Sequence, residues 1–282
     1  MATLGDLDRR WIFLAMGLLV VGMYAAGVKA DLPSSPYVDS FYRTVEELPP
    51  RSIVLLSADF DPASAAELLP MYTGVIHHLL ARKLRIVNTA TWPAAPPYIR
   101  QEFARIAPLY GAVYGEDWVE LGFKPGDDVA MGIIAQSLQN AFPTESRDGR
   151  SYADVPLLRE VGAGMQGIDL LVTMSAGYPG ILEWIAQVGG RYDVPIVCGT
   201  TAVQTPDIFA FYPRQVRGFL GAATGATQYL QLVDEVTTDA GVTAIKEENQ
   251  RRMQVQSWGH VLIIGLIVLG NVIYFRGKRA PR

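Results

Sequence analysis

The chain has 282 residues, enough for one large domain or two small ones, and 50% of them are hydrophobic. Its formal net charge of -4 gives no support for nucleic-acid binding, which relies on a basic surface, so we expect no nucleic-acid partner. The single cysteine, Cys198, excludes an internal disulfide framework.

A short tail at residues 1–10 precedes an uncharged apolar stretch at residues 11–28. As a helix rising about 1.5 Å per residue, this stretch is about 27 Å long, close to the hydrocarbon core of a bilayer. The alternative is a cleaved signal peptide, with Val28, Lys29 and Ala30 as the cleavage site. Because the apolar run is long for a signal core, the sequence favours a retained transmembrane helix.

Residues 29–50 are polar and contain four prolines, at positions 33, 36, 49 and 50. This composition predicts a connector that leaves the membrane and leads into a folded domain at residues 51–235.

Strands and helices alternate through residues 51–235. Apolar runs predict strands at residues 52–57, 84–89, 118–123, 170–175, 195–198 and 217–220. Helical spacing of apolar residues predicts helices at residues 62–83, 97–110, 127–142, 179–189, 201–212 (broken by a proline) and 222–235. Residues 144–156 interrupt the alternation and are predicted as a surface flap or partner contact. The pattern specifies an α/β fold, a Rossmann-like three-layer sandwich with a mostly parallel sheet.

The C-terminal part begins with a charged helical linker at residues 236–257, followed by a second apolar stretch at residues 258–275 and a basic tail at residues 276–282. The apolar stretch predicts a second transmembrane helix. Asn271 and Gly265 within it are candidates for contact with a neighbouring membrane helix, because a buried amide seeks a partner and glycine permits close approach.

Basic residues at both ends of the chain predict how it is oriented. Arg9 and Arg10 precede the first apolar stretch, and four basic residues follow the second. Positive charge favours the cytoplasmic side, so we expect a two-pass protein of the cell membrane with both termini cytoplasmic and the central domain outside. Basic residues on the other side weaken this pattern; they are Lys29, Lys246, Arg251 and Arg252.

Residues 162–167 (GAGMQG) match the letters of a dinucleotide-binding fingerprint. In that fingerprint the glycines follow a strand and open a helix, so that the helix N-terminus meets the pyrophosphate. Here they follow a predicted helix and lead into a strand. The inverted context favours a helix-to-strand turn, and the sequence implies no cofactor.

Asp59 and Asp61 form an acidic pair directly after the first predicted strand. Their spacing resembles the haloacid-dehalogenase phosphatase motif and the DxD metal motif of glycosyltransferases, which implies a divalent metal or an aspartyl nucleophile. The phosphatase motif needs a later lysine and acids in a set order, which Lys124 and the acids after it do not follow. Asp61 before Pro62 is also typical of a helix N-cap, and the sequence favours this interpretation.

A ligand-binding site is predicted at the carboxyl ends of the strands, where open parallel sheets bind ligands. The segment at residues 176–180 (AGYPG) enters a helix N-terminus, which favours a small anionic ligand. The same glycines and hydroxyls are also ordinary turn and capping residues. The candidate ligand-binding residues are Asp59, Asn88, Thr91, Lys124, Ser175, Gly177, Tyr178, Thr200 and Thr201.

Three functions fit this sequence. The favoured one is a membrane-anchored, non-catalytic binding or scaffold subunit of a homo-oligomer or larger membrane complex, because no coherent catalytic set is present. The second is an anchored enzyme that uses Asp59 and Asp61 with a divalent metal for phosphoryl or glycosyl transfer. The third is a small-molecule sensor. In each case the lipid bilayer is an expected partner.

Overall fold

The computed structural model describes residues 9–27, 31–237 and 240–279. The chain divides into two compact units. The larger one spans residues 32–246 and is a complete α/β domain, whereas the smaller one is formed by the two ends of the chain. The larger unit is wider than the predicted domain at residues 51–235, because helices at both of its ends belong to it.

A six-stranded sheet forms the centre of the larger unit, with strand order β3-β2-β1-β4-β5-β6 and all neighbours parallel. This confirms the predicted α/β, Rossmann-like class. The order reverses between β1 and β4, which makes that pair the topological switch point of the sheet. The strands are β1 Ile53–Asp59, β2 Arg85–Ala90, β3 Trp118–Phe123, β4 Leu170–Ser175, β5 Ile196–Thr200 and β6 Gly218–Gly221.

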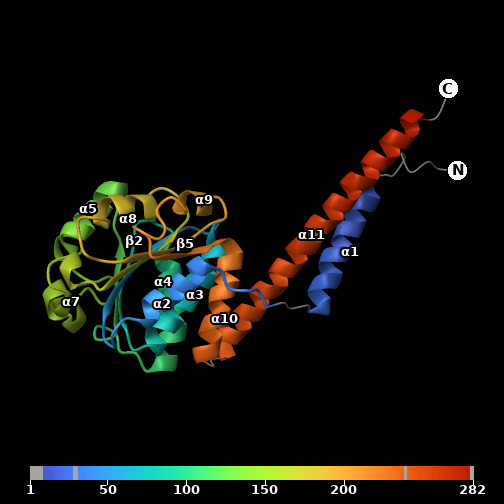
Figure 1. Ribbon diagram of the computed structural model, residues 1–282. Helices are drawn as coiled ribbons and strands as arrows, with labels where there is room; N and C mark the ends of the chain where they lie inside the picture. Colours follow the sequence, from blue (N-terminus) through green and yellow to red (C-terminus); the bar gives the residue numbers. More distant parts are fainter. Residues whose placement is uncertain (1–8, 28–30, 238–239, 280–282) are drawn as a thin grey trace. The chain divides into compact units, whose positions relative to one another are not determined.

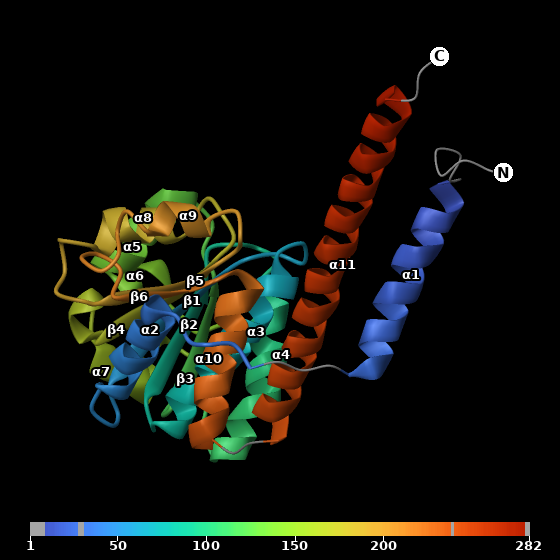
Figure 2. The same cartoon turned by 45° about the vertical axis from the view of Figure 1, so that its right-hand side comes forward.

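Helices cover both faces of the sheet and give three layers (Figures 1 and 2). On one face lie α2 Pro36–Glu46, α3 Ala65–Ala81, α4 Pro96–Ile106 and α10 Ala222–Thr237. On the other face lie α5 Asp127–Gln136, α6 Leu138–Ala141, α7 Pro156–Val161 and α8 Ile181–Val188. The short helix α9 Thr205–Ile208 is all that forms of the helix predicted at residues 201–212.

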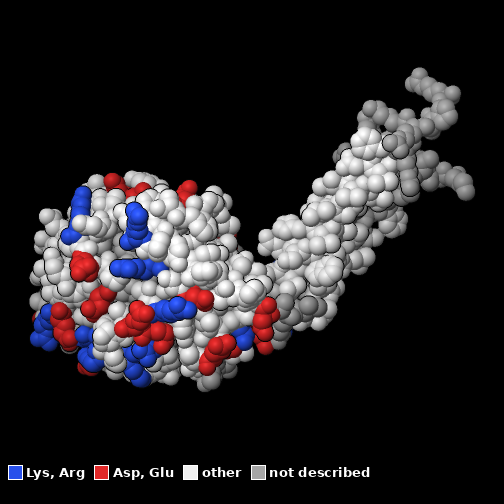
Figure 3. All heavy atoms as spheres, in the orientation of Figure 1, with Lys and Arg blue, Asp and Glu red and all other residues white. Residues whose placement is uncertain are grey.

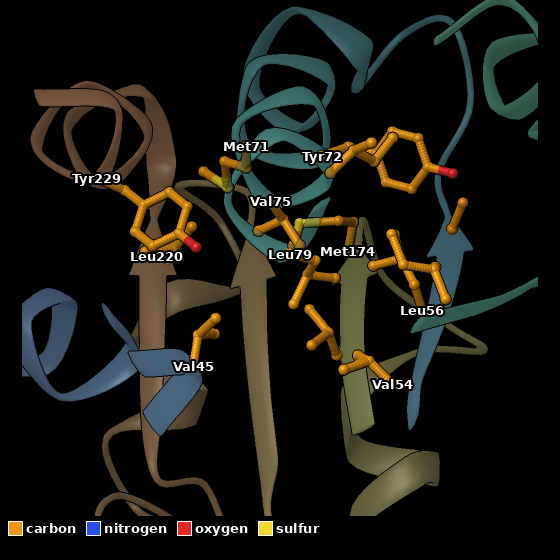
Figure 4. Packing of buried hydrophobic residues seen from close by; sticks show 14 of the residues in the cluster. Val45, Val54, Leu56, Met71, Tyr72, Val75, Leu79, Met174, Leu220 and Tyr229 are labelled. Atoms are coloured by element: carbon orange, nitrogen blue, oxygen red, sulfur yellow. The ribbon is translucent and has the colours of Figure 1, made fainter. Parts of the chain in front are cut away.

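The strands are continuously apolar because both of their faces are buried. In β1, Val54 and Leu56 pack with α3, whereas Leu55 points to the opposite core. Figure 4 shows Met71 and Val75 of α3 lying over the strands in the first of these cores. Each face therefore carries a hydrophobic core of its own.

Helix α2 occupies much of the segment that the sequence predicts as a connector. Pro36 takes its first position, where proline is tolerated, and Val38, Phe41 and Val45 form a buried stripe at helical spacing. The helix packs closely against β6: a Cβ on Gly218 would lie 2.2 Å from the backbone nitrogen of Phe41. Because β6 is an edge strand, α2 shields this edge of the sheet.

The opposite edge strand, β3, is covered by the segment predicted as a flap. The backbone N–H of Ser146 donates to the carbonyl of Glu120 in β3 (2.9 Å). The buried carboxylate of Glu145 holds the segment in shape by accepting from the backbone N–H groups of Arg147, Asp148 and Arg150 (2.8–2.9 Å). The structural role of residues 144–156 is thus to cover the edge strand β3.

The smaller unit contains α1 Arg9–Ala26 and most of α11 Ala240–Arg279, a single helix of 40 residues. Residues 241–272 are long and apolar enough to cross a membrane, while α1 is apolar but shorter. The hydroxyl of Tyr24 donates to the carboxylate of Glu248 (3.1 Å), so the end of α1 contacts α11 there. Two of the basic residues that enter the orientation prediction, Lys29 and Arg282, lie outside the described residues.

Candidate functional site

Asp59 lies at the carboxyl end of β1, at the topological switch point, and is fully buried. Its carboxylate accepts hydrogen bonds from five donor groups on four residues. These are the hydroxyl of Ser57 (2.8 Å), the backbone N–H and hydroxyl of Thr91 (3.0 and 2.6 Å), the hydroxyl of Thr173 (2.9 Å) and the indole N–H of Trp184 (3.0 Å). The carboxylate therefore joins β1, β4, α8 and the end of β2.

Strand geometry brings these groups together. Side chains alternate between the two faces of a strand, so Ser57 and Asp59 both point toward α8. Ser57 is paired in register with Thr173 of β4, which places a second hydroxyl on the same face. Trp184, buried in α8, points its indole N–H at the carboxylate.

The electrostatics of Asp59 reflect two opposing effects. Burial raises the pKa of the carboxyl, because the charged form loses its hydration, while the hydrogen bonds from Thr91, Trp184 and Ser57 lower it. The net direction is upward. Since donors of the protein itself surround both oxygens, this carboxylate acts as a structural junction in the present arrangement.

Asp61 has separate partners. Its side chain accepts from the backbone N–H of Ser64 (3.0 Å) and from the Ser64 hydroxyl (2.7 Å), and these bonds lower its pKa. It thus caps the turn that leads into α3, which begins at Ala65. Among the residues that the structure describes, no group of three or more His, Cys, Asp or Glu side chains could hold a metal ion.

The entry into α8, predicted as an anion site, is bonded within the chain. The backbone N–H of Ile181 donates to the Ser175 hydroxyl (3.0 Å), and that of Gly180 donates to the carboxylate of Glu183 (2.8 Å). The indole of Trp92 donates to the carbonyl of Pro179 (2.7 Å) and ties the same segment to the end of β2. The chain's own carboxylate therefore occupies the position where an external anion was expected.

Two of the other predicted residues lie away from Asp59. Asn88 donates to the hydroxyl of Tyr72 in α3 (2.7 Å), so it points to the opposite face of the sheet. The ammonium group of Lys124 donates to the carbonyl of Ala141 (2.8 Å).

The remaining predicted residues lie at the last position of β5 and in the loops after β4 and β5. Tyr178 is exposed, and its hydroxyl donates to Asp128 (3.1 Å). Thr200 bonds Thr205 through its hydroxyl (3.0 Å), and the carbonyl of Thr201 accepts from the backbone of Thr205 (3.0 Å). The carbonyl of Gly177 accepts a long bond from Gln204 (3.4 Å). Of the nine candidates, the structure joins only Asp59 and Thr91 by a hydrogen bond of a side chain.

Sequence reasoning missed Ser57, Thr173 and Trp184 as partners of Asp59. The signal for Ser57 was its spacing of two from Asp59, which puts both on one face of a strand. Trp184 is fully buried, and a buried indole N–H needs an acceptor, which Asp59 provides.

Residues 162–167 lie between α7 and β4. A Cβ at Gly167 would lie 2.0 Å from the carbonyl oxygen of Val161, so this glycine allows the chain to turn tightly after α7. The structure confirms the helix-to-strand turn.

The fold and the site together define a Rossmann-like α/β domain whose switch point is filled by its own side chains. Comparison with known protein families finds no family model that matches this chain. Comparison with curated proteins finds no match either.

Proposed function

We propose that this chain is a membrane-anchored, non-catalytic α/β subunit that binds or organises partners within a homo- or hetero-oligomeric membrane complex. In this proposal α1 and the apolar part of α11 both cross the membrane, both termini are cytoplasmic, and the α/β domain lies outside. The observation that carries the proposal is the closed switch point around Asp59.

Rossmann-like domains that act on nucleotides hold them at the switch point, against glycine N–H groups at a helix N-terminus. In this chain Trp184 and Thr91 bind the carboxylate of Asp59 at the end of β1. The metal-dependent transferase alternative would require Asp59 to give up these donors and Asp61 to leave Ser64. This supports a domain whose carboxyl edge serves stability rather than catalysis.

The anchors are supported by their exposed apolar surface. Large side chains on α11, including Ile264, Ile267 and Val268, are more than half exposed in the single chain. Trp11 and Phe13 on α1 are exposed as well. Apolar surface of this extent on a helix is typical of contact with lipid or with another membrane helix.

Assembly through α11 is supported by two small or polar positions. Asn271 is exposed, and a Cβ at Gly265 would meet no atom within 4 Å. In lipid an amide gains by bonding to a neighbouring helix, although the average gain is only about 0.6 kcal/mol. A second copy of the chain or another membrane subunit would supply that neighbour.

The test is the mass of the full-length protein in mild detergent. We expect an assembly larger than a monomer, weakened modestly by Asn271→Leu without loss of the folded domain. Val268→Leu, an apolar change on the same helix, is the matched control and should leave the assembly unchanged. A wild-type protein that is monomeric at every concentration, alone and in membrane extracts, would exclude the scaffold function.

A further inference from the structure

A cleft of about 760 Å³ opens between α2 and the segments that lead into β5 and β6. These segments lie at the amino ends of the parallel strands, whereas Asp59 lies at the carboxyl end of β1. The cleft and Asp59 are therefore at opposite ends of the strands. Its volume falls within the range of about 300–1,000 Å³ that is common for small-molecule sites. The two walls come from parts of the chain far apart in sequence, which α2 brings together by packing on β6.

The walls carry charges of both signs. Asp39 and Arg43 of α2 and Glu47, directly after the helix, follow one another at spacings of four and line the cleft, and Arg217 lines the opposite wall. In the part of the chain that the structure describes, Arg43 and Arg217 have no ion pair within 4.0 Å. Figure 3 shows acidic and basic side chains interspersed over the face of the larger unit that carries α2.

The cleft also offers apolar contact. Tyr212 and Pro195 contribute to the lining. The ring of Tyr212 packs edge-on against Phe219 of β6, with 5.7 Å between centroids, which fixes its position relative to the sheet. A ligand would therefore meet a firm aromatic surface between the charged groups.

From these features we propose that the cleft binds a small zwitterion, a molecule with an oxyanion at one end and an ammonium group at the other. Guanidinium groups such as those of Arg43 and Arg217 recognise carboxylate or phosphate through paired N–H donors. Asp39 and Glu47 repel a simple anion but attract an ammonium group. A ligand that carries both charges uses all four side chains, whereas a simple anion or cation meets repulsion from two of them.

The same chemistry has two sources, because aminophosphates occur free in solution and as phospholipid headgroups. The probe for the class is phosphoethanolamine, with inorganic phosphate and ethanolamine as its two halves. Binding to the full-length chain in detergent micelles is measured by calorimetry. We expect phosphoethanolamine to bind roughly tenfold or more tightly than either half, because each charged hydrogen bond contributes on this scale.

Variants assign the binding to the cleft. Arg43→Gln with Arg217→Gln should reduce phosphoethanolamine affinity roughly tenfold or more and Glu47→Gln should reduce it less. The matched control is Arg159→Gln, an exposed arginine of α7 that does not line the cleft. It should bind as the wild type does. Circular dichroism verifies that each variant is folded.

A second arm distinguishes the two sources. Phosphatidylethanolamine added to the micelles should compete with the soluble probe if a headgroup reaches the cleft, and should leave the titration unchanged if the ligand is a free solute. The proposal is overturned if phosphoethanolamine binds no better than phosphate, or if the arginine double variant and the control behave alike. Ligand binding does not depend on assembly, so its failure is separable from failure of the scaffold function.

Discussion

Asp59 illustrates how a single buried carboxylate can organise several elements. An ionised group without partners would be very costly to bury, and five protein donors offset that cost here. Its neighbour Asp61, two residues later, is nearly free of that constraint because it caps an exposed turn. The two acids therefore respond differently to the same substitution.

We predict that Asp59→Asn destabilises the domain by about 1–3 kcal/mol, because the amide nitrogen brings N–H donors against the donors of its partners. Asp61→Asn should be almost silent, since asparagine caps about as well as aspartate, and Asp61→Ala should cost about 1 kcal/mol. Chemical denaturation monitored by circular dichroism measures all three.

The same variants test the metal hypothesis. Melting temperatures with and without Mg²⁺ or Mn²⁺ should show no metal-dependent shift in wild type, Asp59→Asn or Asp61→Asn. A wild-type stabilisation that disappears in both variants would support the enzyme in place of the scaffold.

His78 is a second buried polar residue, on α3. Its Nε2 lies 2.8 Å from the carboxylate of Glu46 and its Nδ1 lies 2.7 Å from the hydroxyl of Tyr229. Tyr42 stacks on the ring at 4.7 Å, and Arg82 faces Glu46 at 3.5 Å. A neutral imidazole satisfies both hydrogen bonds, with Nε2 donating and Nδ1 accepting.

Burial lowers the pKa of His78 below its ordinary value of 6.5, and Glu46 opposes this shift. The unfolded chain therefore takes up this proton first as the pH falls, so the folded state loses stability from about pH 6.5 downward. We predict that His78→Gln, compared with wild type, shows a smaller loss of stability on acidification. Uptake of one proton changes the free energy of unfolding by at most about 1.4 kcal/mol per pH unit. Equal acid slopes for the two proteins would contradict the prediction.

At the scale of elements, α2 depends on close contact with β6. Gly218 permits this contact, because a Cβ there would lie 2.2 Å from the backbone nitrogen of Phe41. Backbone cannot yield as a side chain can, so we predict that Gly218→Ala displaces α2 and lowers the melting temperature by several degrees (roughly 1–3 kcal/mol of stability).

The matched control is Gly177→Ala in the loop after β4. A Cβ at Gly177 would meet no atom within 4 Å, so this variant should melt as the wild type does. Equal melting temperatures for the Gly218 and Gly177 variants would show that α2 does not pack against β6 as described.

The sequence predicts the central elements well, because their signals are local. The limits of β3 and β4 match their apolar runs, and the Rossmann-like class follows from the alternation of strands and helices. Helix α2 escaped notice because the prolines around it suggest a connector, although the spacing of Val38, Phe41 and Val45 is helical. The larger unit accordingly begins at residue 32, before the predicted start of the α/β domain at residue 51.

The candidate site was less predictable, because its contacts are not local. Asp59 and Thr173 are 114 positions apart, and only the pairing of β1 with β4 brings them together. The carboxyl ends of parallel strands are a general place for binding sites. Sequence alone does not reveal that Trp184 of α8 donates its indole N–H to Asp59 there. The cleft beside α2 could not be predicted from the sequence, because the helix that forms one of its walls was itself not predicted.

For the molecule as a whole, we predict that both termini lie in the cytoplasm and the α/β domain lies outside. With Cys198 replaced, a cysteine at the exposed position Ser146 should react with a membrane-impermeant reagent in intact cells, and one at Ala280 should not. Permeabilised cells provide the control, because both positions should then react. Labelling at Ala280 alone in intact cells would reverse the orientation.

The packing of α2 on β6 also determines when the domain can finish folding during synthesis. The hydroxyl of Ser40 donates to the carbonyl of Arg217, a contact that spans 177 positions. When α2 leaves the ribosome, β6, the strand that it covers, has not yet been translated. Phe41 and Tyr37 therefore remain unpacked until most of the sheet has been synthesised. The completed domain is therefore closed by its first helix, and chains that stop before residue 218 would expose that helix's apolar face to chaperones and proteases.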